Sequence, residues 1–239
     1  MRTTHLLAAA CTALLSSACL LDTGEPDTSF IADYQFGVGQ TASGWAAGAV
    51  DFPAAEEGDV GFVGDVRVRP EETLDLAPAL YLQGANVSGD LFMYWYRMID
   101  GFVPNAEYTI GVDIEYSSRF GRDCTTGAGP TTWIKAGAVG VEPSRSVDQS
   151  GNYRLNVDKG QHATGGATVL SLGDLRTNAP GCIVNGPYSV WGRHSGQDAL
   201  RVRASAAGQL WLIFGIESTA AGTLTMYINR FGVRFRPVS

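Results

Sequence analysis

The sequence has little charge and no long apolar run, and each scarcity excludes a class of protein. Only 17% of its 239 residues are charged, and 24 acids against 17 Lys and Arg give a net charge of −7. A nucleic-acid-binding protein needs a basic surface to neutralise phosphates, so we expect no nucleic-acid partner. No stretch approaches the roughly twenty consecutive apolar residues of a membrane-spanning helix.

Catalytic and zinc-binding motifs are also missing. Beyond the N-terminal segment the sequence has only two histidines, His162 and His194, and no Gly-x-Ser-x-Gly motif marks a hydrolase nucleophile. A zinc site needs several His or Cys ligands at characteristic spacing. Since the chain has two such histidines and no cysteine cluster at that spacing, we expect no zinc site. The chain is nevertheless 45% hydrophobic, which is enough to form a core.

Residues 1–18 have the pattern of a secretory signal, with Arg2, an apolar stretch and then small residues. Ser16-Ser17-Ala18-Cys19 resembles a lipobox, in which the cysteine is acylated, although Ser16 stands where most such boxes have Leu. We therefore expect residues 19–29 to be a tether, and Cys19 to anchor the protein to a membrane of the cell envelope. The alternative is ordinary cleavage after Ala18, which leaves a soluble periplasmic or extracellular protein with a free thiol.

The number of cysteines favours the lipid anchor. Cys11 is removed with the signal, and acylation of Cys19 leaves Cys124 and Cys182, which can pair in an oxidising compartment. The sequence therefore predicts a Cys124–Cys182 disulfide.

Beyond residue 30 the hydrophobic pattern is that of strands. Residues 107–117 alternate, with Tyr108 and Ile110 beginning an apolar face and Asp113 and Glu115 on the other. Residues 91–99 are apolar on both faces, as in a central strand that is covered on each side. Further strands are predicted at residues 79–83, 132–141, 153–157, 168–172, 199–204, 209–216 and 223–236. We expect a bulge at Gly232 and at most a helical turn or two near residues 71–76.

Short strands separated by Gly, Asn and Pro turns predict an all-β fold. We expect one domain over residues 30–239, built as a β-sandwich of two antiparallel sheets.

Several stretches resemble known families. Gly44-Trp45, ALYLQG, GFVPNAEYT and the final MYINRFGVRF occur in the order found in jelly-roll carbohydrate-binding modules and galactose-binding-like domains. The DLFMY, YRLNVDKG and LWLIFG stretches are similar to uncharacterised bacterial secreted lipoproteins. The first resemblance implies a jelly roll that binds carbohydrate, and the second implies no activity.

The pair Asp113 and Glu115 resembles part of the E-x-D-x-E motif of retaining β-glucanases. Gly111 stands where that motif has its nucleophile. A retaining glycosidase needs two carboxyl groups about 5–5.5 Å apart, and neighbouring outward positions on a strand are roughly 7 Å apart. We therefore expect that this chain is not an enzyme. A glycosidase with a degenerate form of this motif is the third hypothesis for its function.

Carbohydrate sites combine aromatic platforms with polar side chains. The candidate platforms are Trp45, Trp133 and Trp191, which lie beside Gly or Thr near predicted strand ends. For each of them, packing in the core is the alternative. The candidate polar contacts are Arg97, Asp113, Glu115 and Arg154.

Exported jelly rolls often hold a structural calcium ion through loop oxygens. The candidate ligands are Asp33, Asp148, Asp158 and Asp198, and ordinary loop acids are the alternative.

Taken together, the sequence predicts an exported, lipid-anchored β-sandwich that binds a polysaccharide or glycoconjugate without catalysis. A structural or adhesion-like lipoprotein that binds a protein partner is the alternative.

Overall fold

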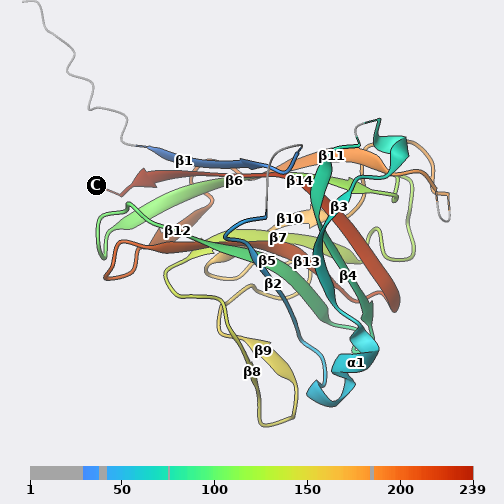
Figure 1. The fold of residues 1–239 in the computed structure, drawn as a ribbon, viewed down its shortest axis with the longest axis horizontal. Helices are drawn as coiled ribbons and strands as arrows, with labels where there is room; N and C mark the ends of the chain where they lie inside the picture. The colour runs from blue at the N-terminus through green and yellow to red at the C-terminus, as the bar shows by residue number, and fades with distance from the viewer. Residues whose placement is uncertain (1–28, 38–41, 75, 184–185, 239) are drawn as a thin grey trace, which may run out of the picture.

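The computed structural model describes residues 29–37, 42–74, 76–183 and 186–238. They form a jelly-roll β-sandwich, with two antiparallel sheets that lie one above the other in Figure 1. The predicted signal peptide, Cys19 and the tether up to residue 28 lie outside the described residues. Within the described part, no helix is long and apolar enough to cross a membrane.

The larger sheet has seven strands. Its main path runs in the order β11-β6-β14-β4-β3, while β1 pairs with β14 and β12 pairs with β6. The strands are β1 (Phe30–Gln35), β3 (Val63–Val68), β4 (Pro78–Asn86), β6 (Glu107–Ser118), β11 (Ser189–His194), β12 (Leu200–Arg203) and β14 (Gly222–Pro237).

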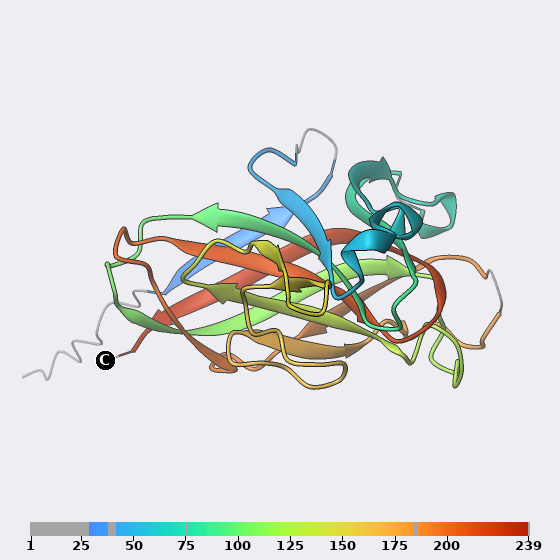
Figure 2. The ribbon, with the colours of Figure 1, turned by 90° about the horizontal axis from the view of Figure 1, so that it is seen from below.

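The smaller sheet has five strands in the order β10-β7-β13-β5-β2. They are β2 (Ala46–Val50), β5 (Leu91–Ile99), β7 (Thr132–Val139), β10 (Val169–Asp174) and β13 (Leu210–Ser218). A separate hairpin of β8 (Arg145–Val147) and β9 (Tyr153–Leu155) lies in front of this sheet in Figure 2. The helical elements are short: η1 (Ala54–Glu56), α1 (Glu57–Val60) and η2 (Glu71–Thr73).

The core lies between the two sheets and is rich in aromatic rings. Phe214 of β13 contacts Phe231 of β14, with ring centroids 4.3 Å apart, and Trp45 packs on Phe214 at 5.0 Å. Each sheet supplies alternate residues to this core, because successive side chains of a strand point to opposite faces. The strand β6 does this as predicted, and its inward residues are Tyr108, Ile110, Val112, Ile114 and Tyr116.

The strand β5 has the predicted cover on both faces. Met93 and Trp95 point into the main core, whereas Phe92 and Tyr94 belong to a second apolar cluster on the outer side of the five-stranded sheet. Every residue of β5 from Leu91 to Trp95 is therefore buried.

Several local predictions were wrong. The bulge of β14 lies between Ile228 and Arg230, while Gly232 pairs regularly with Asp33 and Asp113. The short helical turn predicted near residues 71–76 is confirmed as the 3-10 turn η2, whereas η1 and α1 were not predicted. The strands β1, β2, β3, β8 and β11 were not predicted, because they lack a strong alternation of apolar and polar residues.

The predicted disulfide is confirmed. Cys124, after β6, is bonded to Cys182, which lies between β10 and β11, across a sequence separation of 58 residues. A bond across such a loop restricts the unfolded chain. It stabilises the folded state mainly because it lowers the conformational entropy of the denatured state.

Replacing both cysteines by serine is expected to lower the free energy of unfolding by up to about 4 kcal/mol, the chain-entropy value for a loop of this length. Urea denaturation of the wild type and of the double variant Cys124→Ser/Cys182→Ser measures the difference. Identical denaturation midpoints would show that the bond does not contribute.

Candidate functional site

A groove of about 700 Å³ lies on the outer face of the five-stranded sheet. It lies between β2, β5, α1 and the segment that leads from β7 into β8. We call it the aromatic groove, and its ring-bearing residues are Phe52, Phe62, Tyr94 and Tyr96.

The alternation of β5 and its pairing with β2 build the floor of the aromatic groove. Phe92, Tyr94 and Tyr96 are two residues apart and so point to the same outer face. Gly48 of β2 lies opposite Tyr94, and a Cβ atom at Gly48 would lie 2.7 Å from the Tyr94 hydroxyl. The Tyr94 ring therefore occupies the space that a side chain at position 48 would fill.

An ion pair forms one wall. Glu57 of α1 accepts a hydrogen bond from Arg145 Nη2 at 2.7 Å through Oε1 and one from the Tyr153 hydroxyl at 2.9 Å through Oε2. These two bonds lower the pKa of Glu57, so its carboxylate stays ionised in mild acid. Burial raises the pKa of Tyr94 to about 12, so its hydroxyl stays protonated and can donate.

The rings of Phe62 and Tyr96 are half-buried at the groove, whereas those of Phe52 and Tyr94 are almost fully buried. In the part of the chain that the structure describes, the hydroxyls of Tyr94 and Tyr96 have no hydrogen-bond partner. Sequence analysis missed both tyrosines, because they lie in a run that is apolar throughout. The signal that could have identified them is their two-residue spacing with Phe92.

None of the three predicted tryptophan platforms lines this groove. Trp45 is only 8% exposed and packs among core rings, so the prediction that it is a platform was wrong. Trp133 is the second residue of β7 and packs on His162 with ring centroids 5.4 Å apart. Trp191 of β11 is half-buried against the core and lines a hollow of about 270 Å³ with Arg176 and Arg193.

Asp113 and Glu115 lie on the outer face of the other sheet. There a hollow of about 380 Å³ is lined by polar side chains that include Asp33, Asp113 and Arg230, and its lining contains no Phe, Tyr or Trp. Arg230 binds Asp33 through two hydrogen bonds of 2.8 and 3.0 Å and approaches Asp113 at 3.3 Å. Both carboxylates of this polar hollow are therefore paired with the same arginine.

The structure explains why Gly111 replaces a carboxylate in the motif. The strands β11 and β12 pair with different halves of β6, and the segment between them crosses over Gly111. A Cβ atom at Gly111 would lie 3.0 Å from the Cα atom of Gln197. A larger side chain does not fit there, so the nucleophile position of the glucanase motif is filled by backbone.

The two predicted polar contacts from arginine have other partners. Arg97 lies 4.9 Å from the Tyr34 ring and donates to the Ser43 carbonyl. Arg154 donates to Asp148 and Asp51, both at 2.9 Å.

The four predicted calcium ligands lie on four different elements. Asp33 binds Arg230, and Asp148 accepts from Arg154 and from the backbone of Ser150 and Asn152. A calcium ion would have to displace these donors, so the arrangement does not favour it. The other two candidates accept hydrogen bonds as well, Asp158 from Gly160 and Ala167 and Asp198 from Thr109.

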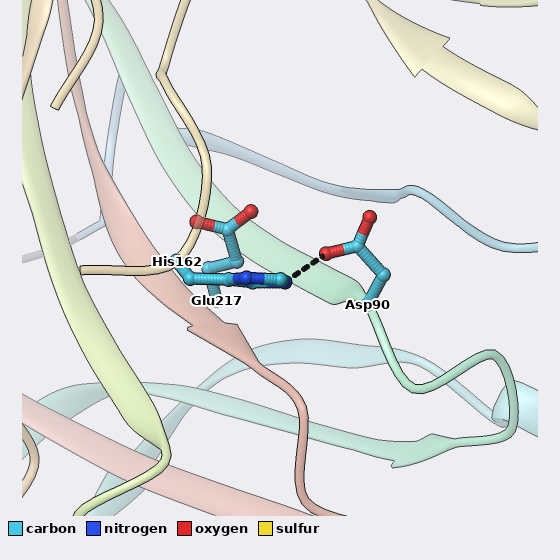
Figure 3. A group of neighbouring side chains, drawn as sticks. All are labelled: Asp90, His162 and Glu217. Carbon is cyan, nitrogen blue, oxygen red and sulfur yellow. Dashed lines mark hydrogen bonds and ion pairs between the residues drawn. The ribbon is translucent and has the colours of Figure 1, made fainter. Parts of the chain in front are cut away.

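Among the described residues, Asp90, His162 and Glu217 form one group whose possible ligand atoms all lie within 4.8 Å of one another (Figure 3). His162 Nε2 lies 3.1 Å from Asp90 Oδ1. Glu217 already binds the ammonium groups of Lys135 and Lys159. A metal ion would be repelled by these two cations, so the donor set does not fit one.

No protein-family model matches the sequence, and a comparison with curated proteins found no match. Among solved structures, the chain is similar to the carbohydrate-binding module TmCBM61 in complex with β-1,4-galactotriose, at 11% identity and TM-score 0.37. That alignment covers 81% of this chain and 89% of the module. The mannan-recognising module TmCBM27 aligns at 10% identity over 87% of this chain and 98% of its own, with TM-score 0.37.

The K1 cleaved adhesin domain of Lys-gingipain from Porphyromonas gingivalis is similar at 12% identity and TM-score 0.37, over 88% of this chain and 99% of that domain. What these proteins share with this chain is a β-sandwich. A likeness this distant does not indicate what this chain binds.

The close approach over Gly111 predicts a stability effect. Gly111→Ala is expected to lower the free energy of unfolding by about 1–3 kcal/mol, because the backbone at Gln197 must shift. Gly192→Ala on the neighbouring strand is the matched control, since its nearest contact would be an ordinary 3.8 Å. Urea denaturation of both variants tests this, and equal effects would contradict the packing argument.

The lowered pKa of Glu57 predicts a pH dependence. Since its folded pKa lies below its ordinary value of about 4.5, its contribution to stability is present above about pH 4.5 and is lost as the pH falls through the folded pKa. Wild type is therefore expected to be more stable than Glu57→Gln at neutral pH, with a difference that shrinks in acid. Thermal unfolding at several pH values measures it, and a constant difference would contradict the assignment.

Proposed function

We propose that this chain is a non-catalytic carbohydrate-binding β-sandwich whose ligand lies in the aromatic groove. The observation that carries the proposal is the combination of the half-buried rings of Phe62 and Tyr96 with the Glu57–Arg145 ion pair in one groove. Sugar rings have apolar faces and hydroxylated edges, so they need both kinds of contact. The groove volume of about 700 Å³ is within the range of about 300–1,000 Å³ that ligand pockets have.

The chemistry of the groove suits binding more than hydrolysis. A glycosidase needs a carboxylic acid that is still protonated near neutral pH, which requires a raised pKa. The bonds from Arg145 and Tyr153 instead lower the pKa of Glu57. Its carboxylate suits a role as hydrogen-bond acceptor for a sugar hydroxyl.

The proposal also includes a location at the cell envelope. A signal peptide and an acylated Cys19 would hold the sandwich at the cell envelope, where polysaccharides and glycoconjugates are accessible. The tether would let the groove reach a ligand away from the membrane surface.

The test is isothermal titration calorimetry of the protein with a panel of soluble polysaccharides and oligosaccharides. Tyr96→Ala is expected to weaken binding of the preferred glycan by about tenfold, because a stacked ring contributes about 1.5 kcal/mol. Gly48→Val is expected to weaken it as well, because a side chain there displaces the Tyr94 ring. Tyr96→Phe keeps the ring and should retain most of the affinity.

His194→Ala is the control, because His194 lines the polar hollow on the opposite sheet. If His194→Ala abolishes binding and Tyr96→Ala does not, the ligand lies in the polar hollow and the aromatic groove is the wrong site. If no glycan binds, the proposal fails and an envelope protein becomes the expected partner.

A further inference from the structure

A buried ionic network lies on the outer face of the five-stranded sheet, next to the aromatic groove. We define it as Lys135, Lys159, Asp51, Glu217 and Arg154. Lys135 and Glu217 have fully buried side chains and are 3.0 Å apart. Lys159 lies between two carboxylates, 3.0 Å from Asp51 Oδ2 and 2.5 Å from Glu217 Oε1.

The choice of cations in this network is unusual for the chain. Of its 17 basic residues 15 are arginine, and both lysines, Lys135 and Lys159, belong to the network. Arginine is always charged and satisfies carboxylates well, so charge pairing alone does not require lysine. A lysine differs because its amine can lose a proton and act as a nucleophile.

The backbone segments that carry Lys159 and Asp51 are held in place. The Lys135 ammonium donates to the carbonyls of Lys159 and Thr164, at 3.3 and 2.8 Å, and so holds the loop that carries Lys159 against the sheet. Asp51 has a φ of +67°, a left-handed conformation that costs free energy for a residue other than glycine.

We propose that Lys159 and Asp51 condense to an intramolecular amide bond, formed by the folded protein itself. The Lys159 nitrogen bonds to the Asp51 carboxyl carbon, and the bond from that carbon to Oδ2 breaks. Oδ2 leaves as water with two of the three ammonium protons, and the third proton stays on the amide nitrogen. Atoms and charge balance without an oxidant, a reductant or an activated co-reactant.

The neighbouring residues have roles in this step. Arg154 Nη1 lies 2.9 Å from Asp51 Oδ1 and stabilises the negative charge that develops there during attack. Glu217 Oε1 contacts the Lys159 ammonium and takes a proton from it, so that the neutral amine can attack the Asp51 carboxyl carbon. It then passes protons to the leaving oxygen. A shallow hollow lined by Arg154, Lys159 and Gln161 gives the released water a path to solvent.

Burial favours the product. Burial opposes the charge of Lys159, but the Asp51 and Glu217 carboxylates outweigh it and raise its pKa, so the starting state is a buried ion pair. Each buried ion carries a desolvation penalty, and condensation removes two of them. The remaining charges stay paired, Lys135 with Glu217 and Arg154 with Asp148.

Intact-mass spectrometry of the denatured full chain tests the proposal. Wild type is expected to be lighter than its composition by one water, about 18 Da, relative to Lys159→Arg purified side by side. Because each chain has only two lysine side-chain amines, an amine-reactive label should modify one of them in the denatured wild type. Tryptic peptides should show no cleavage after Lys159 and a link to the peptide that contains Asp51.

Two variants probe the chemistry. Asp51→Asn keeps an electrophile and is expected to lose ammonia in place of water, a deficit of about 17 Da that a non-covalent network cannot produce. Glu217→Gln removes the relay and is expected to leave most chains at full mass. A wild type at full mass with two reactive lysines would overturn the proposal, and a bond mapped to Lys135 and Glu217 would overturn the assignment.

Discussion

Strands β5 and β13 are covered on both faces, and the chemistry of the molecule depends on this double burial. Inward residues such as Trp95 and Phe214 fill the main core, while Phe92 and Ile213 on the other side belong to the second apolar cluster. Polar groups on that outer side are then removed from water and must find partners. Glu217 is fully buried there, and two lysines bind it.

The two outer faces of the sandwich consequently differ. On the seven-stranded sheet, the residues around Asp113 remain open to solvent, and Arg230 joins two carboxylates in exposed ion pairs, which contribute little to stability. On the five-stranded sheet, the cover by the β8–β9 hairpin and the loop after it ends at β2 and α1, where the aromatic groove opens. The rings of Phe62 and Tyr96 are only half-buried there.

Two glycines decide the shape of these faces by what they leave out. The missing side chain at Gly48 lets the Tyr94 ring lie across β2, and the missing side chain at Gly111 lets a connecting segment cross β6. The first absence makes room for an aromatic ring on one sheet, and the second makes room for a connecting segment on the other.

The sequence by itself determined the class of fold, the two-faced character of β5, the alternation of β6 and the Cys124–Cys182 pair. These follow from periods of two along one strand and from the number of cysteines, which are local or countable properties. Only the tertiary structure decided which side chains meet. Gly48 lies opposite Tyr94, and Asp51 beside Lys159, because strands and loops far apart in the chain pair in one register. Alternation shows on which face of a strand a residue lies, but the register of a distant partner strand decides what that residue touches. For this reason Trp45 lies in the core, while Tyr94 and Tyr96 line the groove.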